Sequence, residues 1–324
     1  MKNLAVLTLV AALAAVEPGC DRGGAPPASA KPRKLFWVQA LKGHPVHQMT
    51  QLAFTAGCRK LGYEAVVVGT DGPDIAGTIA LAEQALASGE VAGMAVWTGN
   101  PAYQPLMERA AKKGIPVVLP HFPVPEGSAP GARGVISCDP ARYAAEAARR
   151  IGERIDGKGA GAITQGSFNT TENLVAETFA KALKDGFPGA RVLPPVEEGF
   201  DAAAAISKAV SILQANADLA AAFSTTGGGP VTWAGAQREA GRKIVVVGMD
   251  YTRVNLDLVK GGEVFGVIGQ PLWEESHGAA ELLDRLLRGE TIDWWTKLEA
   301  PFLGPDGLDS YYALLDRVEA AIRK

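Results

Sequence analysis

The chain has 324 residues, enough for about two domains of ordinary size. Hydrophobic residues make up 47% and charged residues 21%, which is typical of a soluble globular protein and excludes a disordered chain or a polytopic membrane protein. Lys and Arg number 32 against 35 Asp and Glu, so no excess of basic charge predicts nucleic-acid binding. Three cysteines are too few for a disulfide framework.

Residues 1–20 have the form of a secretory signal. A short positive start precedes the uncharged, apolar run 4–16, which is too short to span a bilayer as a helix. Cys20 follows this run and is similar to the lipidation site of bacterial lipoproteins. Secretion without a lipid, after cleavage near residues 28–30, is the alternative. Residues 21–33 are rich in Gly, Pro, Ala and Ser and predict a flexible tether, so we expect a mature protein in the periplasm or at the cell surface.

The rest of the chain alternates between short apolar runs, which predict buried strands, and longer segments, which predict helices. The alternation occurs twice, so we expect an α/β fold made of two doubly wound parallel-sheet halves with right-handed crossovers. The expected strands are 34–40, 65–68, 93–97, 116–119, 133–138, 161–165, 190–193, 220–224, 244–248 and 264–268. The expected helices are 46–61, 74–88, 101–113, 140–156, 171–185, 202–216, 230–240, 256–260 and 276–287.

Ligands of open parallel sheets bind beyond the carboxyl ends of the strands. Three of the four histidines, His44, His47 and His121, fall in the loops that follow expected strands. They predict hydrogen bonds to an organic ligand; a metal site and a structural role are the alternatives, and no carboxylate or thiolate obviously completes a metal set. Several rings near these loops could line a small-molecule pocket or pack in the core. The four that we include as ligand contacts are Trp97, Phe122, Phe168 and Phe200.

Motifs for catalysis are missing from the sequence. There is no G-x-S-x-G elbow and no Walker A pattern, and the glycines of 157–161 precede a strand, which predicts a turn. The glycines of 227–229 follow a strand and open a helix, so they could either contact a ligand or form a tight turn. Cys58 and Cys138 predict buried free cysteines, although export would permit a disulfide. We therefore expect a binding protein and no enzyme, with no cofactor and no metal.

Four short motifs carry a resemblance to a known family. They are VWTGNP at 96–101, KGIPVV at 113–118, VVGMD at 246–250 and GQP at 269–271. Together they resemble the periplasmic substrate-binding proteins of the sugar-binding type, the ribose- and galactose-binding family that shares its fold with LacI-type repressors. The resemblance covers about residues 34–300. A repressor is disfavoured because no helix-turn-helix precedes the core and an export signal does.

The resemblance implies a type I periplasmic binding protein, in which two lobes joined by a three-segment hinge close on a small solute. The lobes would be 34–135 plus 270–291, and 136–269 plus 292–324. It further implies a monomer that delivers a sugar, polyol or sugar-like compound to the permease of an ABC importer, with membrane contact only through a lipid anchor. The alternatives are a ligand sensor for a membrane receptor and a binder of a non-sugar solute, such as a nucleoside-like or apolar compound or a metal.

By matched position, the resemblance implies ligand contacts from Asn100, Phe200, Asp250 and Gln270. Three positions depart from the family: His121 replaces an acidic residue, Thr226 stands where an Asn is expected, and Asn173 replaces an Arg. Candidate solutes therefore extend from sugars to smaller polyols, modified sugars, nucleosides and a quorum-sensing furanose. The full set of expected ligand contacts is His44, His47, Trp97, Asn100, His121, Phe122, Phe168, Asn173, Phe200, Thr226, Asp250 and Gln270.

Overall fold

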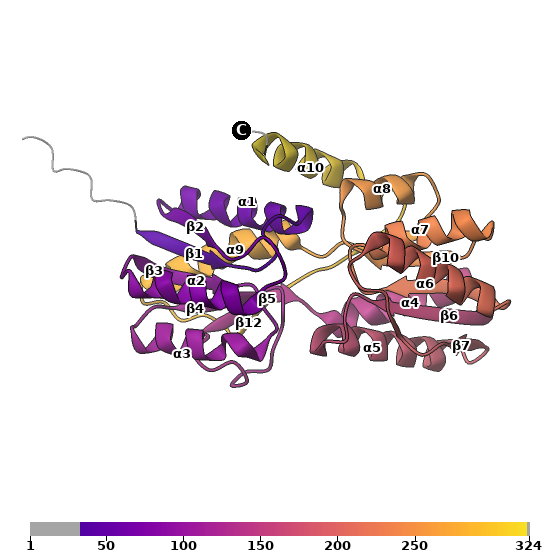
Figure 1. Cartoon of the computed structure of the whole chain (residues 1–324), viewed down its shortest axis with the longest axis horizontal. Coiled ribbons are helices and arrows are strands. Elements are labelled where there is room, and N and C mark those ends of the chain that lie inside the picture. Colours follow the sequence, from indigo (N-terminus) through magenta and orange to yellow (C-terminus); the bar gives the residue numbers. More distant parts are fainter. Residues whose placement is uncertain (1–32, 323–324) are drawn as a thin grey trace, which may run out of the picture. The chain divides into compact units, whose positions relative to one another are not determined.

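The computed structural model describes residues 33–322 (Figure 1). The expected signal, Cys20 and nearly all of the expected tether lie outside the described residues. Within them, the first sheet has six strands, all parallel, in the order β12-β5-β4-β3-β1-β2. These strands are β1 (Lys34–Val38), β2 (Glu64–Val68), β3 (Val91–Val96), β4 (Val117–Pro120), β5 (Gly134–Cys138) and β12 (Trp295–Leu298). Its helices are α1 (Pro45–Lys60), α2 (Ile75–Ala87), the 3₁₀ helix η1 (Pro101–Tyr103), α3 (Gln104–Lys112) and α9 (Leu272–Leu287).

The second sheet follows the order β13-β11-β10-β9-β6-β7, and β8 also pairs with β6. Its strands are parallel except β13, which runs antiparallel to β11. They are β6 (Gly159–Gln165), β7 (Ala190–Val192), β8 (Val196–Glu197), β9 (Leu219–Ser224), β10 (Val245–Met249), β11 (Gly266–Ile268) and β13 (Phe302–Leu303). The remaining helices are α4 (Pro140–Arg154), α5 (Thr170–Gly186), α6 (Ala202–Ala215), α7 (Gly229–Ala240), α8 (Arg253–Lys260) and α10 (Asp309–Ile322).

Local sequence explains where these elements start. All residues of β4 and β5 are buried, as expected of central strands covered on both faces. Several helices begin at a residue whose side-chain oxygen accepts a hydrogen bond from a backbone N–H of the first turn, which satisfies donors that the helix leaves free. These N-cap residues are Asp74 of α2, Asp139 of α4, Asn169 of α5, Asp201 of α6 and Thr252 of α8.

The structure confirms the α/β fold with two parallel-sheet lobes. The expected strands and helices are present with bounds shifted by a few residues. The elements that the sequence analysis did not anticipate are β8, β12, β13 and α10. The three strands are two to four residues long, too short for a periodic pattern to reveal them.

Strand pairing moves two of the expected lobe boundaries. The whole of β5 belongs to the first sheet, so the first crossing follows residue 138 and does not lie near 136. β12 pairs with β5, so residues 295–298 belong to the first lobe and the third crossing comes at 299–301, not at 292. The second crossing, at 269–271, lies between β11 and α9.

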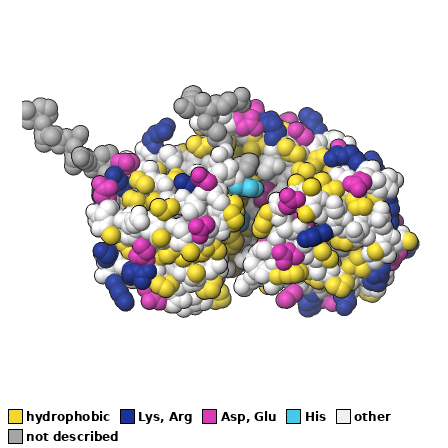
Figure 2. Space-filling view, viewed as in Figure 1, with side chains coloured by type: hydrophobic (Ala, Val, Ile, Leu, Met, Phe, Trp, Pro, Cys, Tyr) yellow, Lys and Arg dark blue, Asp and Glu magenta, His cyan; other side chains and the backbone are white. Residues whose placement is uncertain are grey.

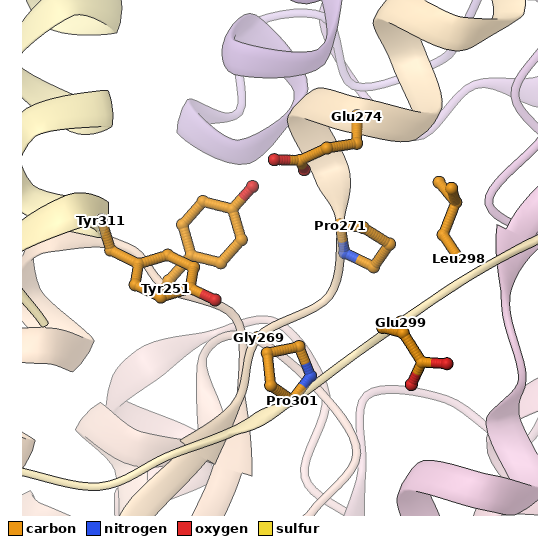
Figure 3. A pocket seen from close by; sticks show the side chains of 8 residues that line it. All are labelled: Tyr251, Gly269, Pro271, Glu274, Leu298, Glu299, Pro301 and Tyr311. Atoms are coloured by element: carbon orange, nitrogen blue, oxygen red, sulfur yellow. The ribbon is translucent and has the colours of Figure 1, made fainter. Parts of the chain in front are cut away.

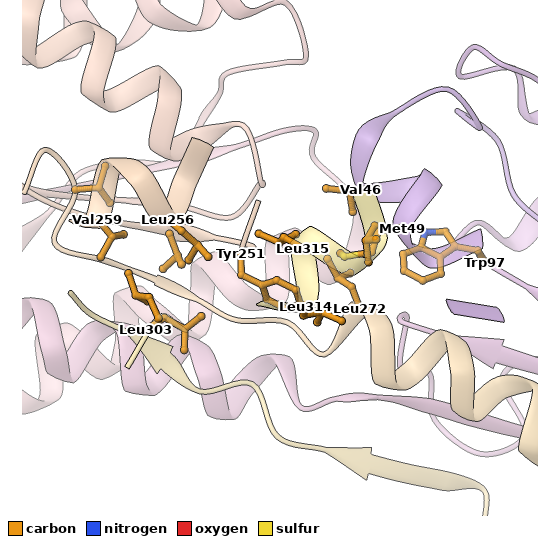
Figure 4. Close-up of a cluster of buried hydrophobic side chains, with 14 of the residues drawn as sticks. Val46, Met49, Trp97, Tyr251, Leu256, Val259, Leu272, Leu303, Leu314 and Leu315 are labelled. Atoms are coloured by element: carbon orange, nitrogen blue, oxygen red, sulfur yellow. The ribbon is translucent and has the colours of Figure 1, made fainter. Parts of the chain in front are cut away.

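The C-terminal helix α10 packs against elements of both lobes. Leu314 and Leu315 are buried in a hydrophobic cluster that also contains Met49 of α1 and Leu256 of α8 (Figure 4). The expectation that residues 292–324 belong to the second lobe is therefore incomplete for this helix, which also contacts α1.

Polar contacts attach α10 to α8. Arg253 pairs with Asp316 and with Glu319, the latter across 2.6 Å between Nε and Oε1. The Tyr312 hydroxyl donates a hydrogen bond of 2.8 Å to Asp257. The helix thus combines charged contacts to the second lobe with apolar contacts to the first.

Cys58 and Cys138 are buried and free, as the sequence predicted. Among residues 33–322, no helix has the length and apolar character needed to cross a membrane.

Candidate functional site

The order of strands marks where each sheet can bind a ligand. In the first sheet β1 lies between β2 and β3, and in the second β6 lies between β7 and β9. The chain therefore moves in opposite directions across the sheet after β1 and after β6, and the loops leaving neighbouring strands separate there to form a crevice. Figure 2 shows histidine side chains where the surface is hollowed between the two lobes.

Aromatic rings gather at the carboxyl ends of β3 and β4. The indole of Trp97 stacks on the imidazole of His121, with ring centroids 4.4 Å apart and planes 11° from parallel. The ring of Phe122 is nearly perpendicular to both, with its centroid 6.1 Å from that of Trp97 and 4.7 Å from that of His121. Stacked and edge-to-face rings stabilise one another and form a stiff wall.

Two further histidines extend this wall from the start of α1. The ring of His47 lies 5.9 Å from Trp97 and 5.3 Å from His44, measured between centroids. Its Nδ1 lies 3.0 Å from the carbonyl oxygen of Ala40. Burial lowers the pKa of His47 to about 4, and the neighbouring His44 contributes, so the ring is neutral at pH 7. With Nδ1–H donating to Ala40, its Nε2 is a hydrogen-bond acceptor.

His121, which is partly exposed, forms a pair with the buried Glu275 of α9. Its Nδ1 lies 2.8 Å from Oε1 of Glu275, whose side chain is fully buried. Burial alone would lower the pKa of His121, but charge attraction and the hydrogen bond from Glu275, with a contribution from Asp250, raise it. Burial raises the pKa of Glu275, while the charge of His121 and its hydrogen bond lower it, so each group of the pair favours the charged form of the other.

From the second lobe, Asp250 contributes a buried carboxylate at the end of β10. Its Oδ1 has no hydrogen-bond partner among the described residues. The Asn255 side chain holds the local backbone, because its Nδ2 donates to the carbonyl oxygens of Gly227, Met249 and Asp250 at 2.9–3.2 Å. Burial raises the pKa of Asp250 to about 6, while the charge of His121 lowers it. Asp250 in turn raises the pKa of His121, so the two groups interact through charge across the two lobes.

Three other expected contacts follow strands of the second lobe: Phe168 and Asn173 come after β6, and Phe200 comes after β8. Asn173 accepts a hydrogen bond of 3.0 Å from Gln165. Phe168 and Phe200 are 57% and 76% exposed, and the ring of Phe200 lies over Gly166, where a Cβ would come within 3.0 Å of it.

Three remaining positions have local roles. Asn100 caps η1, since its Oδ1 accepts a hydrogen bond from Ala102 N–H. Thr226 closes a turn by accepting the Gly229 N–H at its backbone carbonyl. Gln270 is 9% exposed and belongs to the second crossing segment.

The structure thus brings together five expected residues as ring neighbours, and Asp250 with His121 through charge. The described contacts do not join Asn100, Phe168 or Phe200 to that cluster. Sequence reasoning missed Glu275, because the expected helix began one residue later and no local signal relates a helical Glu to a histidine 154 residues away. Among the described residues, no three His, Cys, Asp or Glu side chains gather as metal ligands would.

Comparison with known proteins identifies the family. The model of the periplasmic binding protein domain matches residues 37–291. The chain belongs to this family. A search of curated proteins gave no match.

Solved structures show the same periplasmic binding protein fold. A sugar ABC transporter sugar-binding protein from Bacillus halodurans superposes with a TM-score of 0.79 at 21% identity, covering 86% of this chain and all of that one. A solute-binding protein from Burkholderia graminis, in complex with D-arabinose, gives 0.79 at 22% identity, covering 88% and 99%. A glucose-galactose binding protein from Geobacillus stearothermophilus gives 0.79 at 19%, covering 86% and 100%.

A separate pocket of about 320 Å³ lies at the hinge of this periplasmic binding protein (Figure 3). It is formed where the second and third crossing segments pass beside α10. Its lining residues are Tyr251, Gly269, Pro271, Glu274, Leu298, Glu299, Pro301 and Tyr311. None of them is among the expected ligand contacts.

Proposed function

We propose that this chain is an exported solute-binding protein that captures a sugar or sugar-like small molecule between its lobes and delivers it to an ABC importer. The observation that carries the proposal is the pairing of an aromatic wall on one lobe with the buried, unpartnered Oδ1 of Asp250 on the other. A sugar ring offers an apolar face for the rings and hydroxyl donors for the carboxylate. D-arabinose, bound to the Burkholderia graminis neighbour, is such a molecule.

Binding would proceed by hinge closure without a chemical step. In the open form the solute reaches the wall around Trp97, and contact with Asp250 then requires the second lobe to approach. A ligand that touches both lobes binds the closed form more tightly and shifts the population towards it. The segments at 138–140, 269–271 and 299–301 would absorb the rotation, and the closed form would dock on the permease.

Calorimetric titration and thermal unfolding of the mature protein against sugars, polyols, nucleosides and zinc test the proposal. A solute at about 100 times its dissociation constant should add about 2.7 kcal/mol to the folded state. X-ray scattering should show a smaller radius of gyration with the solute bound. Stabilisation by zinc alone or by apolar compounds alone, with no sugar or polyol bound, would overturn the assignment of a sugar-like ligand.

The proposal includes a lipid anchor at Cys20 and a monomeric protein. Cells fed a palmitate analogue should label the wild-type chain and not Cys20→Ser, and the variant should leave the membrane fraction. Equal membrane association of the two forms would favour secretion without a lipid.

A further inference from the structure

The pair formed by His121 and Glu275 is not explained by stability alone. Glu275 is a helical carboxylate with no exposed surface, and its Oε2 has no hydrogen-bond partner among the described residues. Burying a carboxylate is costly even when it is paired, and an apolar residue at such a position is often as stable. The burial of this carboxylate beside His121 therefore points to an effect on the group that it contacts.

The geometry leaves one polar atom of His121 free. Nδ1 is bonded to Glu275, and Trp97 covers one ring face. Nε2 has no partner in the described structure, and the side chain keeps 15% of its surface exposed. In the protonated ring both nitrogens donate, so Nε2–H is a charged donor available to the crevice.

We call His121, Glu275 and Asp250 the cluster. The groups from other elements that lie around it are neutral. His47 of α1 is neutral because burial lowers its pKa to about 4. On β5 and α4, burial raises the pKa values of Cys138 and Tyr143, which therefore keep their protons. The remaining charge is that of Asp250 from the second lobe. With His121 protonated and with Glu275 and Asp250 ionised, the cluster is one imidazolium between two carboxylates.

We propose that Glu275 is a positioning residue that keeps His121 protonated and fixes its ring, so that Nε2–H donates a hydrogen bond to the solute while Asp250 accepts one from it. This inference rests on the proposed function. It also narrows the solute class to neutral molecules that carry an acceptor and a donor close together, as adjacent hydroxyl groups do. Anionic analogues are disfavoured because the cluster already has a net negative charge.

The test is Glu275→Gln, which keeps the size of the side chain and an oxygen that can accept from Nδ1–H. For the neutral sugar that the wild type binds best, the dissociation constant is measured from pH 5 to pH 9. The wild type should give a bell-shaped affinity profile, with an acid limb from Asp250 near pH 6 and an alkaline limb from His121 above its ordinary value. In Glu275→Gln the alkaline limb should shift down by at least one pH unit, and affinity at pH 7.5 should fall at least tenfold.

Two controls distinguish an effect of the removed charge from an effect on folding. Glu274→Gln removes the neighbouring, exposed carboxylate of α9, which acts on Glu275 through charge and has no hydrogen bond to His121, so it should shift the profile much less than Glu275→Gln does. The imidazole NMR signals of the wild type report protonation directly, and with four histidines in the chain His277→Asn and His47→Asn help to assign them. The titration is read from the wild type, and the two variants serve only to assign its signals.

The outcomes are distinct. If the wild type binds no neutral sugar or polyol, the proposed function fails. If it binds one and Glu275→Gln shows the wild-type profile, or if His121 of the wild type titrates below pH 6, the proposed function stands and the role of Glu275 is wrong.

Discussion

His121 and Asp250 occupy equivalent positions in the two lobes. His121 follows β4 with φ of 77°, and Asp250 follows β10 with φ of 70°. Each donates its backbone N–H to the neighbouring strand, His121 to Ile136 of β5 and Asp250 to Ile268 of β11, both at 2.9 Å. A left-handed backbone at a residue other than glycine costs about 1–3 kcal/mol, and it persists where surrounding contacts hold it, often at binding sites. The repeated geometry places an imidazole and a carboxylate at matching positions in the two lobes.

The buried carboxylate of Asp250 should destabilise the unliganded protein at neutral pH. Its pKa is about 6 when folded, against an ordinary 3.8, so between these values the folded state holds more protons and stability falls as pH rises. Asp250→Asn should therefore increase the free energy of unfolding at pH 7.5 by about 1–3 kcal/mol and abolish solute binding. Urea unfolding at pH 7.5 and pH 4 checks this. A variant less stable than the wild type at pH 7.5 would contradict it.

The absence of a side chain at Gly227 leaves room for the carboxylate of Asp250. A Cβ at residue 227 would lie 2.4 Å from Oδ2 of Asp250, so Gly227→Ala must displace the carboxylate. We expect at least a tenfold loss of solute affinity, measured by calorimetry. Gly228→Ala is the matched control, because a Cβ there meets nothing within 4 Å and its φ is −78°. Equal losses in the two variants would mean that the turn itself matters and Asp250 does not.

The charge of the crevice should select against anionic sugars. Lys42, a cation in the loop after β1, pairs with Asp71, and the central cluster has one imidazolium between two carboxylates. A ligand carboxylate about 6 Å from one net negative charge costs about 1–3 kcal/mol at an intermediate effective dielectric constant. If galactose is the ligand, galacturonate should therefore bind at least tenfold more weakly than galactose. For another sugar ligand, the same difference should separate that sugar from its own uronate. Tighter binding of the uronate would refute the charge assignment.

The helix α10 should contribute to the stability of the whole fold. Leu315 is 7% exposed in the cluster of Figure 4, so Leu315→Ala should lower the free energy of unfolding by about 2–4 kcal/mol. Leu174→Ala on α5 is the control, because that side chain is 44% exposed and its loss should cost about 0.5 kcal/mol or less. Similar effects of both substitutions would show that α10 packs loosely.

Strand and helix positions were predictable because local patterns carry them. Apolar runs such as 117–120 are completely buried, and Asp or Asn residues mark the helix starts that they cap. The short edge strand at 295–298 was not predictable, since only pairing with β5 makes it a strand. The same holds for α10, which was absent from the predicted elements although its buried leucines help to join the lobes.

By itself, the sequence determined the fold class, the two doubly wound halves and the loops that carry the candidate site, because each follows from local periodicity and from the geometry of parallel sheets. Only the tertiary structure decided which charges meet. Glu275 reaches His121 across 154 residues because α9 packs beneath β4, and the protonation of both groups depends on burial and on that contact. The order of residues in the sequence does not show that His121 and Glu275 lie close together, whereas the chemistry of the crevice depends on that contact.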